Sequence, residues 1–391
     1  MNILFQYYTC GGGGLANIVL LLESIAQIFP DDRLDIVCKE SSGFSTLGYL
    51  DNVFIHTVGG FPQTEVRRAY LAIWELPKIA RKCDSDVIWS MNIGLYRRIG
   101  IPHVLSVHNA HQVYPWSVVR YHPDHSIHVA SLRWFFRRSL LVSDGAITQT
   151  DLVADYIRNI RHRPTNIAVV PKSVESKNES AFVPLPGNIR QLMKQPASDP
   201  FFTYIYVATA TPHKNHRTLI SALELLRMMG LKIRIVLTLS RAEVCDIGGD
   251  LADRLIMSGH ILPVGWADKR YLRELYEACD ACVMPSVLEC LSSAHLEAMQ
   301  WNKPQISSDL PFARDICGDA ALYASAEDPK DWARKMHTLM TNPSLRASLV
   351  DAGHDRMDLM PASWAVAATR VRGFLAQVVE NSSTGIVTAS T

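Results

Sequence analysis

The sequence lacks the features that mark membrane-spanning and secreted proteins. Nowhere do about 18 apolar residues follow one another without interruption, which argues against a membrane-spanning helix. The chain does not open with a positively charged segment followed by an apolar core, so no secretory signal is predicted. We therefore expect a cytoplasmic protein.

An excess of charge of one sign is also missing. The 39 Lys and Arg residues balance the 38 Asp and Glu residues to a net charge of +1. Without a global field, the chain as a whole attracts neither nucleic acid nor an acidic membrane surface, and any basic patch must be local. We expect no nucleic-acid partner.

The cysteines follow no disulfide framework. Cys279 and Cys282 form a Cys-x-x-Cys pair, but no second pair of Cys or His follows at zinc-ligand spacing. The pair lies at a predicted helix end and in an apolar strand, where free cysteine behaves as a small hydrophobic residue. The sequence therefore predicts neither a metal site nor a structural disulfide among its eight cysteines, which are Cys10, Cys38, Cys83, Cys245, Cys279, Cys282, Cys290 and Cys317.

What the sequence does have is enough apolar residues for two domains. With 391 residues, 48% of them hydrophobic, the chain can bury a full core and exceeds the usual size of one domain. Strand-like runs alternate with helical segments, which predicts an α/β fold with doubly wound parallel sheets. The strands expected in the first half are Ile3–Tyr8, Leu34–Cys38, Val53–Val58, Asp86–Ser90, Val104–Val107, Ala146–Thr148 and Ile167–Val170.

A change in composition separates the two halves. Residues 182–200 are rich in proline and polar residues and have no regular periodicity, which predicts an interdomain linker. We expect one domain over residues 1–181 and a second over 201–361, starting with a strand at Phe202–Val207. A helix is expected over 362–380, and the small polar residues 381–391 predict a disordered tail.

The most informative stretch runs from Pro285 to Met299. It follows an apolar strand, Ala281–Met284, and contains two glutamates, Glu289 and Glu297, with small and hydroxylated residues between them. A turn from strand to helix here would place Glu289 at the carboxyl edge of a sheet and Glu297 in the next helix. Carboxylates can hold hydroxyl groups, and a helix start attracts an anion, so a sugar nucleotide would suit both.

This stretch, Pro-Ser-x-x-Glu, seven residues and Glu-Ala-Met, resembles family 4 of the retaining glycosyltransferases, also called glycosyl transferases group 1. The resemblance implies two Rossmann-like doubly wound domains facing a central cleft, the GT-B fold, with a final helix that crosses back to the first domain. It implies transfer of a hexosyl group, mannosyl or glucosyl, from a nucleotide-diphosphate sugar to a saccharide or lipid-linked saccharide in cell-surface polysaccharide or lipopolysaccharide synthesis. Neither a further cofactor nor a metal is expected.

The resemblance also assigns roles to residues. It places Glu297 on the ribose hydroxyls, Glu289 on the sugar hydroxyls, and Lys214 on the diphosphate, where an ammonium would neutralise the leaving group. His108, after the strand Val104–Val107, would reach the sugar from the first domain. A pKa near neutrality would let this imidazole share a proton. His111 is a second candidate for the same role.

Further donor contacts are expected around these groups, with departures from the family pattern. Leu291, Ser292 and Ser293 would offer backbone amides to the departing phosphate, and the serines are also candidates for hydroxyl contacts. The chain reads Cys290-Leu291-Ser292 where the family commonly has Gly-Phe-Gly. Thr209 replaces the Arg that usually precedes Lys214 by five positions. Val264 and Gly265 are candidates for contacts to the base.

A glycine run after the first strand, Gly11 to Gly14, admits two interpretations. In the family it would lie against the donor phosphates or the acceptor, which makes Gly13 and Gly14 binding candidates. Gly11, Gly13 and Ala16, with Glu40 after the second strand, also fit a loose dinucleotide fingerprint. An NAD(P)-linked oxidoreductase is therefore an alternative, as are a nucleotide-sugar epimerase and a catalytically silent partner subunit.

The segment Ser131–Leu141 predicts an amphipathic helix. Leu132, Phe135, Phe136 and Leu140 share one face, while Arg133 and Arg137 share another. We favour a helix packed on the sheet with a basic solvent face. The alternative is a membrane-surface helix that holds the enzyme peripherally at the inner face of the membrane.

Overall fold

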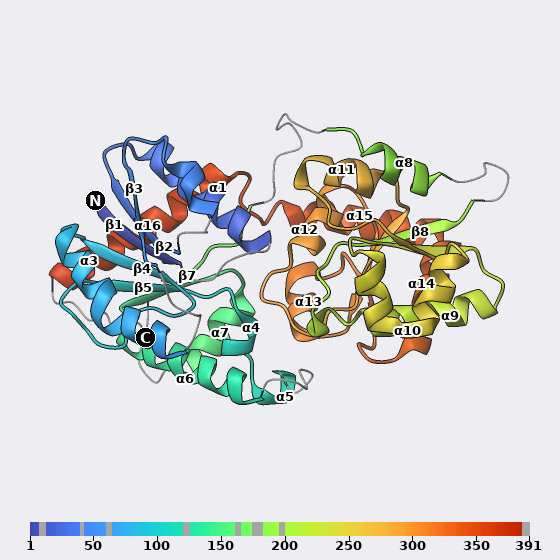
Figure 1. The fold of residues 1–391 in the computed structure, drawn as a ribbon, viewed down its shortest axis with the longest axis horizontal. Coiled ribbons are helices and arrows are strands. Elements are labelled where there is room, and N and C mark those ends of the chain that lie inside the picture. The colour runs from blue at the N-terminus through green and yellow to red at the C-terminus, as the bar shows by residue number, and fades with distance from the viewer. Residues whose placement is uncertain are drawn as a thin grey trace. The chain divides into compact units, whose positions relative to one another are not determined.

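The computed structural model describes residues 1–7, 13–39, 43–59, 65–119, 126–160, 166–173, 183–194 and 200–384, shown in Figure 1. These residues form two compact units. The first unit comprises Met1–Ser173 together with Pro361–Thr391, and the second comprises Val174–Met360. The C-terminal segment after Pro361 therefore belongs to the first unit.

The first unit is built on a parallel sheet with the strand order β3-β2-β1-β4-β5-β6-β7. Its strands are β1 (Asn2–Tyr7), β2 (Arg33–Cys38), β3 (Val53–Thr57), β4 (Val87–Met91), β5 (His103–Ser106), β6 (Gly145–Thr148) and β7 (Asn166–Val169). Strand order reverses between β1 and β4, the position at which doubly wound sheets open a ligand crevice. The expected strands of this half are confirmed, with ends shifted by one residue in most cases.

Helices cover both faces of this sheet. Alternate residues of β1 point to opposite faces. Phe5 packs in a cluster with residues of α1 (Gly13–Ile28) and α16 (Trp364–Ser383), and Leu4 packs in a cluster with residues of α3 (Leu76–Lys82). Figure 1 shows α1 and α16 alongside each other. The helices of this unit are α1 (Gly13–Ile28), α2 (Glu65–Tyr70), the π-helical η2 (Leu71–Glu75), α3 (Leu76–Lys82), α4 (Ala110–Val113), α5 (Trp116–Val119), α6 (Ser126–Val142), α7 (Asp151–Ile160) and α16 (Trp364–Ser383), with a short 3₁₀ turn η1 (Gly43–Leu47).

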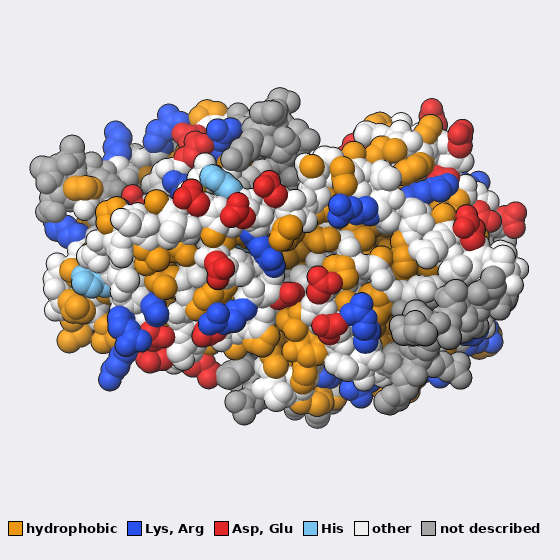
Figure 2. Space-filling view, turned by 180° about the vertical axis from the view of Figure 1, so that it is seen from behind, with side chains coloured by type: hydrophobic (Ala, Val, Ile, Leu, Met, Phe, Trp, Pro, Cys, Tyr) orange, Lys and Arg blue, Asp and Glu red, His pale blue; other side chains and the backbone are white. Residues whose placement is uncertain are grey.

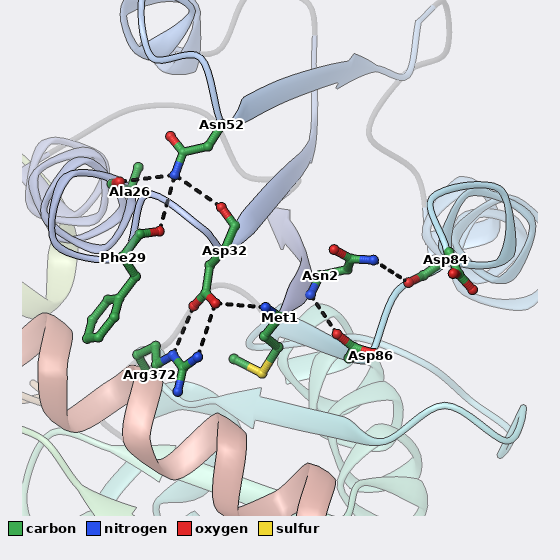
Figure 3. Close-up of polar contacts among 9 residues, drawn as sticks. All are labelled: Met1, Asn2, Ala26, Phe29, Asp32, Asn52, Asp84, Asp86 and Arg372. Atoms are coloured by element: carbon green, nitrogen blue, oxygen red, sulfur yellow. Dashed lines mark hydrogen bonds and ion pairs between the residues drawn. The ribbon is translucent and has the colours of Figure 1, made fainter.

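An ion cluster fastens α16 to the start of the first sheet, as Figure 3 shows. Arg372 of α16 donates to both carboxylate oxygens of Asp32, at 2.9 and 3.0 Å, and the ammonium of Met1 lies 2.8 Å from the same carboxylate. Asn52 donates to the carbonyls of Ala26, Phe29 and Asp32. Together these bonds join α16, the end of α1 and the starts of β2 and β3.

The second unit contains another parallel sheet, with the order β10-β9-β8-β11-β12-β13. Its strands are β8 (Phe202–Tyr206), β9 (Ile233–Leu237), β10 (Ile261–Pro263), β11 (Ala281–Met284), β12 (Gln305–Ser308) and β13 (Leu322–Ala324). Its helices are α8 (Gly187–Met193), η3 (Pro212–Lys214), α9 (His216–Met228), α10 (Arg241–Met257, broken at Gly249), α11 (Lys269–Glu277), α12 (Ser293–Gln300), α13 (Pro311–Cys317), α14 (Pro329–Thr341) and α15 (Pro343–Met357). The switch point lies between β8 and β11. The expected doubly wound α/β class is thus confirmed for both units.

Two expectations need correction. Part of the predicted linker 182–200 is the helix α8, because Ile189 and Met193 bury themselves in the core of the second unit. The tail expected over 381–391 begins inside a helix, since α16 continues to Ser383, and residues 385–391 lie outside the described residues.

The described surface agrees with the balanced composition. On the face drawn in Figure 2, acidic and basic side chains are interspersed over both units. Among the helices of the described residues, none is both long enough and apolar enough to cross a bilayer.

Candidate functional site

The candidate site lies where two loops leave the second sheet at its switch point. β8 and β11 are hydrogen-bonded neighbours in parallel register, so the loops that follow them leave from the same edge. The first loop runs through η3 to α9 and carries Lys214. The second runs from Pro285 to α12 and carries Glu289. Open crevices at this position are the usual ligand sites of doubly wound sheets.

Hydrogen bonds tie the two loops together. The Val287 N–H donates to the His213 carbonyl at 2.8 Å, and the Asn215 amide donates to the carbonyls of Pro285 and Ala326, at 3.1 and 2.8 Å. Asn215 has a left-handed backbone, φ +54°, which Asn tolerates better than most residues. The side chain that joins the loops thus also allows the sharp turn into α9.

A buried tyrosine, Tyr206, also contacts both loops. Tyr206, the last residue of β8, donates to the Lys214 carbonyl at 2.9 Å, and its hydroxyl lies 2.9 Å from the Ser286 hydroxyl. Burial raises the pKa of this phenol well above its ordinary value, so it remains a hydrogen-bond donor at neutral pH. The backbone of Lys214 is therefore fixed by contacts that do not involve its ammonium group.

Lys214 and Glu289 form an ion pair across the two loops. Their side chains are 17% and 12% exposed, so both remain within reach of a ligand. Burial opposes ionisation of Glu289, but the charges of Lys214 and His213 and the hydrogen bonds from Lys214 and Ser286 outweigh it. The net effect is a pKa of Glu289 below its usual range, so the carboxylate is ionised at neutral pH.

Glu297 lies in α12 and is oriented by a second buried tyrosine. The hydroxyl of Tyr276, from α11, donates to the Glu297 carboxylate at 3.0 Å. Burial, followed by the charge of Glu297, raises the pKa of Tyr276 well above its ordinary value. Because the phenol stays protonated, it donates a hydrogen bond to the carboxylate over the whole physiological pH range.

The segment between the two glutamates is largely enclosed. Cys290, Leu291 and Ser292 are each less than 9% exposed, and Ser293, the first residue of α12, is half-buried. Ser292 occupies the cap position of α12, whose first amides point toward the loop. The side chain of Cys290, which stands where the family commonly has a glycine, is therefore accommodated inside the protein.

The remaining candidates of the second unit are Thr209, Val264 and Gly265. Thr209 is exposed, and its hydroxyl lies 3.2 Å from that of Thr211. Val264 and Gly265 follow β10, which β9 separates from β8. Their amides donate to the carbonyls of Leu237 and Leu239, at 3.0 and 2.9 Å. The backbone amides of Val264 and Gly265 are thus already occupied, which leaves side-chain and carbonyl contacts for a ligand.

In the first unit, His108 follows β5 at the carboxyl edge of its sheet. Its backbone N–H donates to the side-chain oxygen of Asn92 at 2.7 Å. Burial, together with the charge of Lys172, lowers the pKa of His108 to about 3. This lowered pKa contradicts the expectation of a pKa near neutrality, and the His108 imidazole is neutral at pH 7. His111 donates its backbone N–H to Asn109, which caps α4.

The glycine run is only partly described. Gly13 and Gly14 form the start of α1, after β1, and a Cβ at Gly14 would meet open space. Packing therefore does not require glycine at position 14. Gly11 and Glu40, on which the dinucleotide alternative depends, lie outside the described residues.

The predicted amphipathic helix is part of α6, with one correction. Leu132, Phe136 and Leu140 are buried as expected. Arg133, expected on the solvent face with Arg137, is only 5% exposed. The reason is that its guanidinium donates to the backbone carbonyls of Tyr114 and His111.

Sequence reasoning missed the residues that hold this site in place. Tyr206, Asn215, Ser286 and Tyr276 position the predicted groups, and the sequence pattern gave none of them a role in the site. The Lys-Asn pair before α9 was the one available signal, because Asn is common where the backbone is left-handed.

Comparisons with known proteins agree with this geometry. The model for glycosyl transferases group 1 matches residues 188–356, and that for glycosyltransferase family 4 matches residues 26–177. The chain is 32% identical over 128 residues to O-antigen chain mannosyltransferase B of Escherichia coli, covering 32% of this chain and 33% of that protein. It is 23% identical over 213 residues to O-antigen chain mannosyltransferase RfbU of Salmonella typhimurium, covering 54% and 55%. The chain thus spans a third to about half of the length of these curated relatives.

Solved structures share the fold over nearly the whole chain. Sucrose-phosphate synthase from Thermosynechococcus elongatus matches with a TM-score of 0.72 at 16% identity, covering 97% of this chain and 99% of that one. Anabaena Alr3699/HepE, solved in complex with UDP-glucose, matches with a TM-score of 0.66 at 17% identity, covering 98% and 100%. At such identities the likeness shows the fold alone, which is the GT-B arrangement of two Rossmann-like domains.

Proposed function

The chain belongs to family 4 of the glycosyltransferases, and from this premise we propose that it is a retaining hexosyltransferase using a nucleotide-diphosphate sugar. The observation that carries the proposal is the Lys214–Glu289 pair at the switch point of the second sheet, with Glu297 on the helix that follows. An ammonium, a sugar-binding carboxylate and a ribose-binding carboxylate in this order suit the parts of such a donor.

The ion pair suggests how the donor would enter the site. A diphosphate is a stronger partner for an ammonium than one carboxylate, so it would take Lys214 away from Glu289. Glu289 would then accept hydrogen bonds from the sugar hydroxyls, while Glu297, held by Tyr276, accepts them from the ribose. The amides from Leu291 to Ser293 would face the leaving phosphate, and His108 would contribute a neutral hydrogen bond to the sugar.

The transfer itself breaks the bond between the anomeric carbon and the phosphate oxygen. A new bond forms between that carbon and an acceptor hydroxyl on the same face, and the hydroxyl proton passes to the departing phosphate. Lys214 and the amides at the start of α12 stabilise the negative charge that develops on the leaving group. Because these groups carry that charge, the reaction is proposed to need neither a metal nor a further cofactor.

The names of the relatives narrow the substrate. Two of them are O-antigen mannosyltransferases, and a structural neighbour was solved with UDP-glucose. We propose mannosyl transfer first and glucosyl transfer second, to a saccharide or lipid-linked saccharide in cell-surface polysaccharide or lipopolysaccharide synthesis.

The enzyme is proposed to work in the cytoplasm, peripherally at the inner face of the membrane. Trp134 and Leu141 of α6 are 62% and 55% exposed, and Arg137 and Arg138 are exposed beside them in the sequence. Exposed apolar residues flanked by cations are typical of helices that lie on anionic lipid.

One observation favours a second candidate. Thr209 stands at the position of the family's cationic Arg, and it is exposed and neutral. A chain with half of the cationic pair could bind the nucleotide yet serve as a silent partner subunit of another transferase.

A transfer assay separates the two candidates. The purified protein is incubated with GDP-mannose or UDP-glucose and a panel of saccharide acceptors, with and without EDTA. We expect transfer from one donor, unaffected by EDTA, with the donor's anomeric configuration kept in the product. Nucleotide binding without transfer to any acceptor would support the partner subunit instead.

A further inference from the structure

A group of potential metal ligands lies in the first unit, on residues to which the proposed reaction gives no role. Asp35 belongs to β2, His56 to β3, and Cys83 caps the C-terminal end of α3. The Asp35 Oδ1 atom lies 2.7 Å from His56 Nε2, and Cys83 Sγ lies 3.6 Å from the same nitrogen. All three ligand atoms lie within 4.8 Å of one another, and among the described residues this is the one such group.

The ligand set has the chemistry of a zinc site. Thiolate, imidazole and carboxylate bind Zn²⁺ at about 2.3, 2.0 and 2.1 Å, and tetrahedral angles then separate the ligand atoms by about 3.4 to 3.6 Å. The distance from Cys83 Sγ to His56 Nε2 already has this value. The distance from Asp35 Oδ1 to His56 Nε2 would have to widen by about 0.7 Å, which a small rotation of the half-exposed imidazole provides.

The backbone around the three ligands is fixed by other contacts. The Cys83 N–H donates to the Ile79 carbonyl at 2.9 Å. The turn after Cys83 is bound by Asn2, whose side chain donates to the Asp84 carbonyl and whose N–H donates to Asp86, as Figure 3 shows. Asp35 lies in the middle of β2, between β1 and β3 in the sheet.

Burial and access also suit an ion. The side chain of Asp35 is fully buried and Cys83 is 6% exposed, whereas the His56 side chain is 28% exposed and offers a path from solvent. Arg33 donates to both oxygens of Asp35, at 2.8 and 3.1 Å, and its guanidinium lies 4.0 Å above the Phe54 ring. With the ion bound, Arg33 would retain Oδ2 and orient the carboxylate while Oδ1 faces the metal.

We propose that Asp35, His56 and Cys83 bind a divalent transition-metal ion of the zinc type, with water as the fourth ligand. On binding, the thiol loses its proton to solvent and the sulfur forms a bond to the metal, with no change in oxidation state. The carboxylate and the thiolate offset the 2+ charge of the ion, and the guanidinium of Arg33 beside Asp35 leaves the group with one positive charge. The site cross-links β2, β3 and the end of α3, and it stands independently of the proposed transfer reaction.

Cobalt titration of the full-length protein tests this site. The protein is reduced, stripped of metal and titrated with Co²⁺, whose thiolate complexes give a charge-transfer band in the near ultraviolet. We expect one Co²⁺ per chain with this band, and displacement by Zn²⁺. Cys83→Ser should abolish the band. Cys245→Ser is the matched control, because Cys245 is half-buried and its Sγ also lies near a carboxylate, 3.8 Å from Asp253 Oδ1.

A second variant covers the case in which Cys83→Ser fails to fold. His56→Gln keeps a hydrogen-bond donor for Asp35 but removes the nitrogen ligand, and it should weaken Co²⁺ binding at least about 10-fold. Zn²⁺ should raise the melting temperature of the wild type and of Cys245→Ser only. Absence of a thiolate band in the wild type, or its loss in Cys245→Ser but not in Cys83→Ser, would overturn the proposal.

Discussion

The two units share a doubly wound parallel sheet, yet the described loops at the carboxyl edges of the two sheets are joined in different ways. In the second unit the loops after β8 and β11 are joined by Asn215, Tyr206 and the Lys214–Glu289 pair. In the first unit a backbone-to-side-chain hydrogen bond joins His108 to Asn92, which follow the neighbouring strands β5 and β4. In the second unit, side chains of both loops meet, so that Lys214 and Glu289 lie together at the edge of the sheet.

The units also differ in how the chain completes them. The second unit is one continuous segment, whereas the first needs α16, which returns from the far end of the sequence. The Asp32–Arg372 pair holds that helix against the start of the sheet. Stability of the first unit therefore depends on a contact between residues 340 positions apart.

The largest expected effect comes from removing the ammonium group of Lys214 in the second unit. Lys214→Ala should lower kcat about 10²- to 10³-fold, because one group that stabilises the leaving-group charge is lost. The exposed Lys330→Ala is the control and should keep wild-type kcat. Steady-state kinetics with the donor identified in the transfer assay measure both. Equal kcat values in Lys214→Ala and wild type would show that the Lys214 ammonium does not stabilise the leaving group, which contradicts the role assigned to the second unit.

The next effect concerns stability of the first unit. Asp32→Asn leaves Arg372 without its charged partner and should lower the free energy of unfolding by about 2 to 3 kcal/mol. This is less than for a fully buried pair, because Arg372 is partly exposed. Calorimetry should show a lower melting temperature for the transition of the first unit, and the transition that nucleotide stabilises should keep its midpoint.

The same variant carries a pH test. Burial raises the pKa of Asp32, but Arg372 and the Met1 ammonium outweigh it, and the folded-state pKa lies below its ordinary value. The carboxylate thus adds stability above the unfolded-state pKa of about 3.9, and this contribution is lost as pH falls through the lower folded-state value. The difference between wild type and Asp32→Asn should be constant from pH 7 to about 5 and shrink below about 4. A difference that grows in acid would contradict this assignment.

A smaller effect is expected on nucleotide affinity, which should change in a variant of the second unit but not in a variant of the first. Glu297→Ala should weaken binding of the nucleoside diphosphate by about 1 to 3 kcal/mol, since hydrogen bonds to a charged group are lost. His108→Ala should lower turnover and leave nucleoside-diphosphate affinity unchanged, because the base, ribose and diphosphate are assigned to the second unit. Isothermal titration calorimetry measures both. If His108→Ala weakened nucleotide binding and Glu297→Ala did not, the nucleotide would have to be assigned to the first unit instead.

The smallest effect tests how Glu297 is oriented. Tyr276→Phe removes one hydrogen bond to the carboxylate and should weaken nucleotide binding by about 0.5 to 1.5 kcal/mol. Tyr323→Phe is the matched control, because its hydroxyl also donates to a neighbour, the Gly318 carbonyl, but lies on β13. Similar affinities in the two variants would show that Tyr276 does not position Glu297.

The parts of this account that were predictable depend on short-range patterns. The strands before Lys214 and Glu289 are apolar runs bounded by turn residues, and the family spacing identified Glu289 and Glu297. Contacts that need the folded chain were not predictable, such as the bond from Tyr276 to Glu297 between α11 and α12. Helical periodicity placed Arg133 on a polar face but could not show that carbonyls of Tyr114 and His111 would meet that face.

Burial explains the other differences. The sequence suggested an ordinary imidazole at position 108, but the pKa of His108 depends on how much of it the fold encloses. The predicted linker was judged by its prolines, whereas Ile189 and Met193 form a helix because the second unit offers them a core. Such effects depend on residues distant in sequence, which a local pattern does not contain.

Thermal unfolding against a panel of ligands tests the central claim most directly. Wild type and Glu297→Ala are melted with UDP, GDP, ADP, their common sugar conjugates, NAD and NADP. Ligand at about 100 times its Kd should add about 2.7 kcal/mol of stability. We expect one nucleoside diphosphate and its sugar conjugate to stabilise the wild type, and Glu297→Ala to lose that response. Stabilisation by NAD or NADP alone, or by none of these ligands, would contradict a nucleotide-sugar site on the second unit.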